Sequence, residues 1–213
     1  MLDVFVHLIA KDRPGRPKFC RNGFLFNPGI SDDMAWVVWF TGRPGCGKTT
    51  VAQGAKSVLS EKGIHAKILQ LDEIRRAITP QPRYTEEERE VVYASLAYMA
   101  KLLYDEGINV IVDATANRRK YRDLARTLVP RFAEAYVDAP LDVCISRESI
   151  RRAQFAPKDI YKKSKVVGAA VPGVNVPYEE PVSPEIYVDS AKMKPEESAR
   201  FVADKILEIF GRN

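Results

Sequence analysis

The sequence predicts an α/β fold in which a parallel β-sheet carries helices on both faces. From Ala35 onward, short apolar runs alternate with longer amphipathic segments, and the first of these runs leads through a glycine-rich turn into a helix. Such alternation is typical of parallel sheets, because each crossover between parallel strands needs a helix. The chain has 213 residues, which is enough for one domain with a substantial core.

The glycine-rich turn has the sequence Gly42-Arg-Pro-Gly-Cys-Gly-Lys48-Thr49. It fits the phosphate-loop pattern G-x-x-x-x-G-K-[ST], and it lies between a predicted strand, Trp36–Phe40, and a predicted helix, Lys48–Glu61. In such a loop the backbone N–H groups surround phosphate oxygens, the lysine reaches the terminal phosphates and the hydroxyl group ligates Mg²⁺. The sequence therefore predicts a nucleoside triphosphate site, with Thr49 as the metal ligand. The residues expected to bind the nucleotide are Gly42, Arg43, Pro44, Gly45, Cys46, Gly47, Lys48, Thr49 and Thr50.

The other elements follow from apolar periodicity and from their end signals. The helix that opens at Lys48 should end before Gly63, a typical C-cap residue. A long helix, Thr85–Glu106, opens with the capping-box pattern Thr-Glu-Glu-Glu and closes at Gly107. The short apolar runs predict strands at Ala66–Leu71, Asn109–Val112, Ala133–Val137 and Ile186–Val188. Amphipathic spacing predicts helices at Arg118–Val129, Leu141–Arg152 and Pro195–Phe210, and the residues Val166–Pro184 predict an irregular segment.

Residues 1–34 are interpreted as an N-terminal extension to a phosphate-loop kinase domain at 35–213. Val4–Ile9 and Gly23–Phe26 have the composition of short strands, and the loop between them contains proline and glycine. A hairpin added to the main sheet and a contact in an oligomer, such as a homodimer, are both compatible with this pattern.

Composition narrows the functional class. No apolar run approaches the roughly 20 residues of a membrane span, and no basic leader precedes the first apolar residues, so we expect a protein without a membrane segment. The three cysteines have no paired spacing, which favours a reducing cytoplasm. The net charge of +5 is spread along the chain without a nucleic-acid-binding pattern. We therefore expect a small anionic ligand and not a nucleic acid.

Two carboxylates at strand ends indicate what the nucleotide is used for. Asp72 follows Leu69-Gln-Leu71, and Asp113 follows Val110-Ile-Val112. In an open parallel sheet, ligands bind outside the carboxyl ends of the strands, so both side chains should lie near the phosphate loop. A carboxylate there can orient or deprotonate a hydroxyl group, or support Mg²⁺ through water. An aspartate in this position can also simply cap the next helix. The pattern favours a small phosphotransferase, with Asp72 as base and Asp113 on the metal or acceptor side.

Several segments carry a resemblance to a known family. They are Val37–Gly42, Gln70-Leu-Asp-Glu-Ile-Arg75, Arg83-Tyr-Thr-Glu-Glu-Glu-Arg89 and Arg118–Asp123. With these segments, the last 175 or so residues resemble adenylylsulfate kinases, which use MgATP to phosphorylate the 3′-hydroxyl of adenosine 5′-phosphosulfate (APS). The resemblance implies ATP and Mg²⁺ as cofactors and APS as the acceptor. It also implies Asp72 as base, Tyr84 as an adenine-stacking ring, and Arg75, Arg89 and Arg119 as acceptor ligands.

The most specific similarities lie further along the chain, at Tyr136–Cys144, Pro157–Lys163 and Gly173–Pro181. They resemble the family's Val-Asp-Thr-Pro-Leu-Glu-Val-Cys, Pro-Lys-Gly-Leu-Tyr-Lys-Lys and Gly-Ile-Asp-x-Pro-Tyr-Glu-x-Pro. The resemblance implies a mobile basic lid that neutralises charge on the transferred phosphoryl group. Arg147 and Lys158 would belong to this lid. They would act as catalytic residues together with Lys48 of the phosphate loop, and Lys158 would also contact the substrate.

The chain departs from the family pattern mainly at the expected acceptor site. Val171-Pro172 stands where the family has a second stacking phenylalanine, and Gln70, Val92 and Ala116 replace polar family residues. About seven extra residues lie around Ile150–Ala156. The segment Asp113-Ala-Thr115 resembles kinases of the same superfamily that act on small molecules or polynucleotides. Two alternatives therefore remain: a kinase of this fold with another hydroxyl acceptor, and a nucleotide-binding protein without transfer activity.

Overall fold

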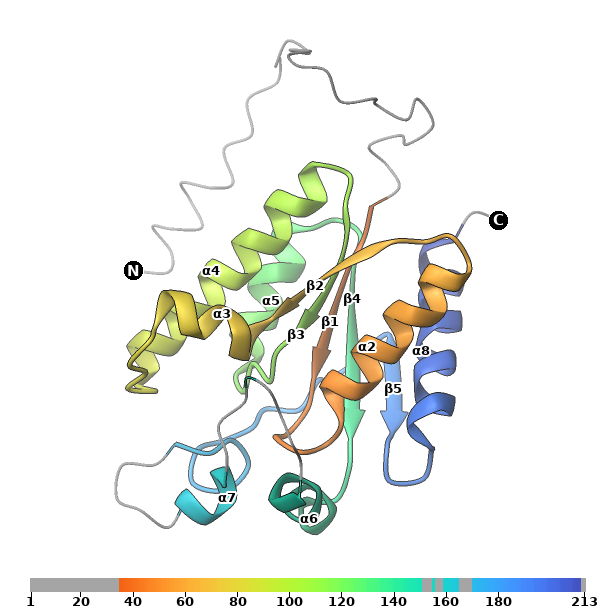
Figure 1. Ribbon diagram of the computed structural model, residues 1–213. Helices are drawn as coiled ribbons and strands as arrows, with labels where there is room; N and C mark the ends of the chain where they lie inside the picture. Colours follow the sequence, from red (N-terminus) through yellow and green to blue (C-terminus); the bar gives the residue numbers. More distant parts are fainter. Residues whose placement is uncertain (1–34, 151–154, 156–158, 165–169, 212–213) are drawn as a thin grey trace. The chain divides into compact units, whose positions relative to one another are not determined.

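The structure is a computed structural model that describes residues 35–150, 155, 159–164 and 170–211. Within these residues, five strands form a parallel sheet in the order β2-β3-β1-β4-β5, with helices on both faces (Figure 1). The predicted fold class is confirmed. The predicted N-terminal hairpin at residues 1–34 lies outside the described residues, and the domain boundary before Ala35 stays a prediction.

The apolar run that begins at Ala35 forms the centre of the sheet. β1 (Val37–Thr41) is buried along its whole length, which fits an apolar strand with neighbours on both sides. It pairs with β3 (Asn109–Asp113) and with β4 (Phe132–Asp138), so that Val38 faces Ile111 on one side and Ala133 on the other. The edge strands are β2 (Ala66–Gln70) and β5 (Ile186–Asp189).

Alternate residues of β1 point into two separate cores. Val38 and Phe40 pack with α2 (Lys48–Glu61) and α8 (Pro195–Phe210) on one face of the sheet. Val37 and Trp39 pack with α4 (Glu86–Asp105) and α5 (Arg119–Leu128) on the other. This arrangement follows from the two-residue period of a strand, and it leaves the carboxyl edge of the sheet free to bind a ligand.

The predicted helix ends are confirmed where a capping residue marks them. The Thr85 hydroxyl accepts a hydrogen bond of 3.2 Å from the Glu88 backbone N–H at the start of α4. Gly63 and Gly107, which follow α2 and α4, have φ values of 77° and 75°. This left-handed conformation is the one that favours glycine after a helix.

Near the carboxyl ends of the strands, the structure contains two helices that the sequence analysis did not predict. The predicted strand Ala66–Leu71 ends at Gln70, and Leu71 begins a helix, α3 (Leu71–Ile78). A short helix, α7 (Ile160–Lys163), forms in the segment predicted as the basic lid. α6 (Leu141–Ile150) starts where it was predicted, and its predicted end at Arg152 lies outside the described residues. Figure 1 shows α6 and α7 below the ends of the strands.

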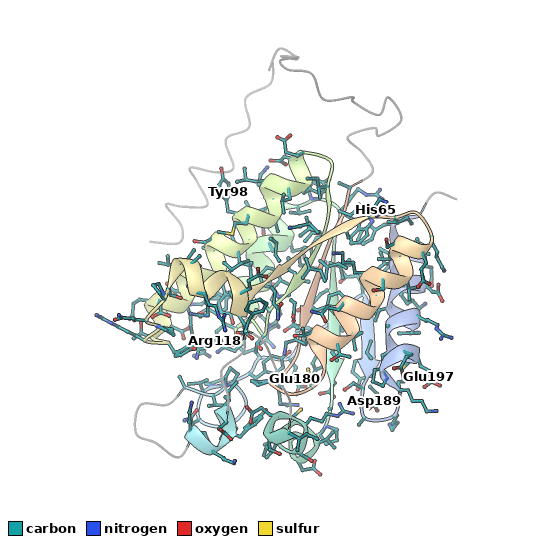
Figure 2. The ribbon with its side chains drawn as sticks, in the orientation of Figure 1. His65, Tyr98, Arg118, Glu180, Asp189 and Glu197 are labelled. Carbon is teal, nitrogen blue, oxygen red and sulfur yellow. The ribbon has the colours of Figure 1, made fainter. Side chains whose placement is uncertain are left out.

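Within the part of the chain that the structure describes, none of the helices combines the length and the apolar character that a membrane crossing needs. Figure 2 shows the polarity of the sheet: His65 lies at the amino end of β2, whereas Arg118 and Glu180 lie toward the carboxyl ends of the strands. The candidate site is at this second edge.

Candidate active site

The phosphate loop makes close contacts with the end of β4 and with α6. Gly42 has a φ of +149°, and a Cβ atom there would lie 2.2 Å from the Val137 carbonyl oxygen. Gly45 has a φ of +81°, and its Cβ would lie 2.3 Å from the Cys144 carbonyl oxygen. Any side chain at either position would therefore collide with backbone. The glycines of the motif are required for packing as well as for the curl of the loop.

Lys48 lies within the curl of this loop. Its side chain is 9% exposed, and its ammonium group donates hydrogen bonds of 2.9 Å and 3.0 Å to the carbonyl oxygens of Gly42 and Arg43. An ammonium group fixed in this way is a preorganised positive charge for the terminal phosphates of a nucleotide.

A carboxylate from the sheet contacts the next residue of the motif. The Thr49 hydroxyl donates a hydrogen bond of 2.6 Å to Asp113 Oδ2, at the end of β3. Asp113 is 5% exposed. The pair offers oxygen donors of the kind that Mg²⁺ prefers, and Mg²⁺ usually completes its shell with phosphates and water. The described residues contain no group of three or more His, Cys, Asp or Glu side chains that could bind a metal without such help.

A cavity of about 290 Å³ opens beside this pair. The phosphate loop forms one wall, the starts of α3 and α4 form a second, and α7 with residues 170–172 forms a third. The cavity brings together most of the predicted catalytic and acceptor residues, which come from distant parts of the sequence. Those that line it are Lys48, Thr49, Asp72, Arg75, Tyr84, Arg89 and Asp113.

An aromatic ring lies beside two arginines in this cavity. The guanidinium carbons of Arg75 and Arg89 lie 5.1 Å and 5.9 Å from the centre of the Tyr84 ring. Tyr84 has a φ of 57°, a conformation that is uncommon for residues other than glycine and is often found at functional sites. Arg75 also donates a hydrogen bond of 2.9 Å to Glu88. These contacts hold a planar ring next to positive charge, which suits an anionic aromatic ligand.

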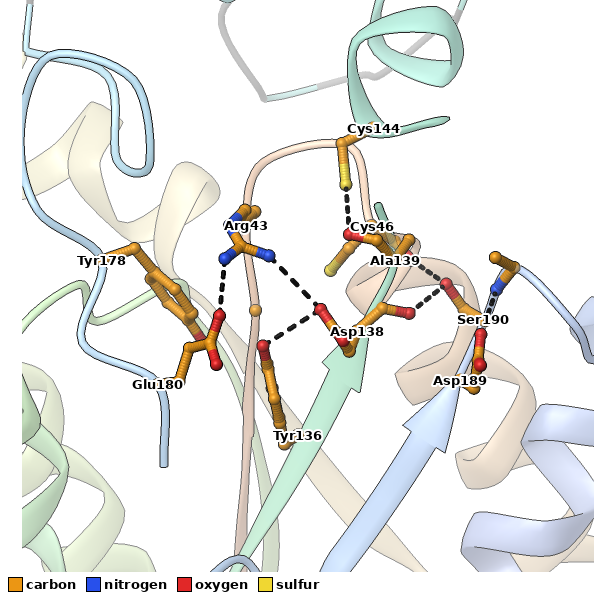
Figure 3. A network of polar contacts seen from close by, with 12 residues as sticks. Arg43, Cys46, Tyr136, Asp138, Ala139, Cys144, Tyr178, Glu180, Asp189 and Ser190 are labelled. Atoms are coloured by element: carbon orange, nitrogen blue, oxygen red, sulfur yellow. Dashed lines mark hydrogen bonds and ion pairs between the residues drawn. The ribbon is translucent and has the colours of Figure 1, made fainter. Parts of the chain in front are cut away.

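The side chain of Arg43 pairs with carboxylates of two other segments. It pairs with Glu180 at 2.5 Å and with Asp138 at 3.4 Å, and Asp138 also accepts a hydrogen bond of 3.0 Å from the Tyr136 hydroxyl (Figure 3). The two ion pairs connect the phosphate loop with β4 and with the segment that precedes β5. The predicted contact of Arg43 with the nucleotide stays a prediction.

The two cysteines near the phosphate loop are buried and free. Burial raises the pKa of the Cys46 thiol above its ordinary value, and it raises the pKa of Cys144 to about 11. Both groups are therefore protonated at neutral pH, and a thiol is less reactive than a thiolate. Both side chains belong to the buried core on this face of the sheet.

Comparisons with known proteins agree with this geometry. A profile of the family described as adenylylsulphate kinase matches residues 34–189. A probable adenylyl-sulfate kinase from Pyrococcus abyssi is 37% identical over 177 residues, which cover 82% of this chain and 96% of that protein. The chain belongs to the adenylylsulfate kinase family.

Solved structures of similar proteins extend the comparison. The APS kinase CysC of Mycobacterium tuberculosis, in complex with AMPPNP and APS, is 30% identical with a TM-score of 0.72, over 82% of this chain and 98% of that chain. A structure described as a sugar kinase from Janibacter sp. is 26% identical with a TM-score of 0.58, over 83% of this chain and 96% of that chain. The fold is therefore similar to those of kinases described with different substrates.

Three residues that the family resemblance predicted as catalytic or acceptor residues are not among the described residues that line the cavity. Arg147 donates to the hydroxyl and carbonyl oxygens of Ser190 at 3.1 Å and 2.8 Å, and the Ser190 hydroxyl donates to the Cys46 carbonyl at 2.7 Å. This places Arg147 beside the phosphate loop, on the side of β5. Arg119 is exposed, and its backbone N–H donates a hydrogen bond of 2.8 Å to Glu179. Lys158 lies outside the described residues.

The cavity wall also contains residues that the sequence analysis did not predict as site residues. Thr115 and Lys163 line the cavity, as do Val171 and Pro172, the pair that stands in place of a family phenylalanine. Lys163 belongs to a lysine pair that the family resemblance had already singled out. Thr115 lies two residues after the end of β3, in the segment Asp113-Ala-Thr115. A small polar residue so close to the predicted site residue Asp113 is the feature of the sequence that could have identified it.

Proposed function

We propose that this chain transfers the γ-phosphoryl group of ATP to the 3′-hydroxyl of APS, which gives 3′-phosphoadenosine 5′-phosphosulfate. The observation that carries the proposal is that one cavity brings the phosphate loop together with Tyr84 and the two arginines beside its ring. The ring suits the adenine of the acceptor, and the arginines suit its phosphosulfate. The description of the Mycobacterium tuberculosis structure, which names AMPPNP and APS together, supports the same pair of ligands.

In the proposed reaction the protein supplies position and charge. Lys48 binds the β- and γ-phosphates, and Asp72 accepts the proton of the acceptor hydroxyl as the hydroxyl oxygen attacks the γ-phosphorus. The bond between the γ-phosphorus and the β,γ-bridging oxygen breaks, and ADP leaves with the electron pair of that bond. Thr49 and Asp113 would hold Mg²⁺, which when bound neutralises charge on the phosphates. Arg147, which donates hydrogen bonds to Ser190, would contact the nucleotide, and Lys158 keeps its predicted role in the lid.

A reducing compartment fits this chemistry. The two described cysteines are free, and ATP is a cytoplasmic substrate, so we propose that the reaction takes place in the cytoplasm. The homodimer remains a prediction from the sequence.

A second acceptor class is favoured by one specific feature of the cavity. Its wall carries the aliphatic pair Val171-Pro172, which offers no second ring to an adenine. A sugar hydroxyl would not need that ring, and the similarity to a structure described as a sugar kinase points in the same direction.

An ADP-release assay with a panel of acceptors separates the candidates. The panel contains APS, gluconate, a nucleoside and an oligonucleotide with a free 5′-hydroxyl, each tested at saturating MgATP. The proposal predicts the highest kcat/KM with APS and no acceptor-dependent release by Lys48→Ala. A higher kcat/KM with another acceptor would establish the second class, and the absence of release with any acceptor would favour a nucleotide-binding protein.

A further inference from the structure

The segment from Ala170 to Pro177 forms part of the wall of the cavity, and two contacts hold its ends. At its start, the Ala170 carbonyl accepts a hydrogen bond of 2.8 Å from Arg89 Nη2. At its end, the Pro177 carbonyl accepts one of 3.0 Å from the side-chain amide of Asn117. Val171 and Pro172, which line the cavity, lie between these two contacts.

The two contacts are joined to each other. Asn117 Oδ1 accepts a hydrogen bond of 3.2 Å from Arg89 Nη1, so one asparagine side chain contacts both the arginine and the far end of the segment. The backbone carbonyl of Asn117 also accepts a hydrogen bond of 2.8 Å from the Glu179 N–H. The segment, the arginine and the asparagine therefore form a closed ring of contacts.

The chemistry of an amide explains why asparagine suits this position. Asn117 is 1% exposed, and its side chain presents an acceptor to a guanidinium group and a donor to a carbonyl group. A carboxylate could not donate to Pro177, and an apolar side chain would leave a buried carbonyl and a buried guanidinium N–H unpaired. Such unpaired groups are costly inside a protein.

We propose that Asn117 is a positioning residue for the acceptor: it holds the guanidinium group of Arg89 in a fixed position relative to residues 170–177, which form part of the cavity wall. The proposal rests on the proposed function insofar as the acceptor is APS. Asn117 does not line the cavity, so it would act through Arg89 and through residues 170–177. It would set the affinity for the acceptor and leave nucleotide binding largely unaffected.

The test compares Asn117→Leu, which removes both amide contacts, with Asn117→Asp, which keeps only an oxygen for Arg89. Asn109→Leu is the matched control. Asn109 is also an asparagine, but it is the first residue of β3 and therefore lies at the amino ends of the strands, away from the cavity. We expect Asn117→Leu to raise the KM for APS by about tenfold or more with the KM for ATP changed by less than about twofold. Asn117→Asp should raise the KM for APS by a smaller factor.

Hydrogen exchange gives a readout that does not depend on the acceptor. In the unliganded full chain, amides of residues 170–179 should exchange about tenfold faster in both Asn117 variants than in the wild type. The exchange rates of residues 42–49 should be the same in these variants as in the wild type. In the Asn109→Leu variant, residues 170–179 should exchange at the wild-type rate. If wild type does not turn over APS but the segment still exchanges faster, the proposed function fails and the positioning role stands. Unchanged exchange, or equal rises in both KM values with a lower Tm, would overturn the positioning role.

Discussion

Replacing Asp113 by asparagine tests the proposed Mg²⁺ site. The Thr49 hydroxyl donates its proton to Asp113 Oδ2 at 2.6 Å, which leaves the hydroxyl lone pairs free to face a cation. With an amide in place of the carboxylate, the charge next to the metal is lost and the threonine proton has a weaker acceptor. We therefore expect Asp113→Asn to weaken Mg²⁺ binding at the nucleotide site and to leave the fold intact.

The expected size of the effect follows from the contact. A hydrogen bond to a charged group is worth about 1.5–3 kcal/mol, and each 1.4 kcal/mol is about a factor of ten. The Mg²⁺ concentration for half-maximal activity should therefore rise by roughly 10- to 150-fold. The assay is ADP release at a fixed ATP concentration with increasing MgCl₂, and ATP binding without the metal is measured in parallel by calorimetry.

The control is Asp138→Asn. Asp138 is also close to the phosphate loop, but the described contacts of its carboxylate are with Arg43 and with two tyrosine hydroxyls. Its Mg²⁺ midpoint should stay within about twofold of the wild-type value. If Asp113→Asn showed the same Mg²⁺ midpoint as the wild type, Asp113 would have no part in metal binding and the Thr49–Asp113 pair would be purely structural.

Three further changes test other parts of the account. Asp72→Asn should lower kcat by roughly 10²–10⁴ with little effect on ATP affinity, and loss of ATP binding with normal kcat would move Asp72 to the nucleotide site. Val171→Phe should tighten APS by several-fold, up to the 150-fold that about 3 kcal/mol of base stacking allows, and weaker APS binding with a faster alternative acceptor would favour the second class. Glu179→Gln should lower Tm at pH 7, because the Arg119 backbone N–H and the Arg118 guanidinium lower the pKa of Glu179. A lowered pKa stabilises the fold above the unfolded value of about 4.3, so the difference in Tm should shrink as the pH falls below that value, and a difference independent of pH would refute the cause.

The sequence was sufficient to predict the sheet and the nucleotide half of the site. A phosphate loop has one geometry, and the carboxyl ends of parallel strands meet at one edge, so Lys48, Thr49, Asp72 and Asp113 could be placed together in advance. The start of α3 could not, because Leu71 continues the apolar run of β2 as well as it starts a helix. The four residues of α7 are too few to show a period.

Long-range contacts decide the rest of the site. Arg147 lies within the helix predicted at Leu141–Arg152, yet its partner Ser190 is 43 residues away in sequence, directly after β5. Asn117 is one of several polar residues after β3, and only the tertiary structure reveals its contacts with Arg89 and Pro177. Neither contact has a local pattern, because packing and not spacing brings these side chains together.

The most direct test of the account is the position of the transferred phosphate. The purified chain is incubated with MgATP and APS, and the product is examined by mass spectrometry and by ³¹P NMR with coupling to the ribose protons. The account predicts one new phosphate monoester coupled to the 3′ proton, with the sulfate retained, and no such product from Lys48→Ala. ADP with inorganic phosphate alone, or a phosphate on any other position, would contradict it.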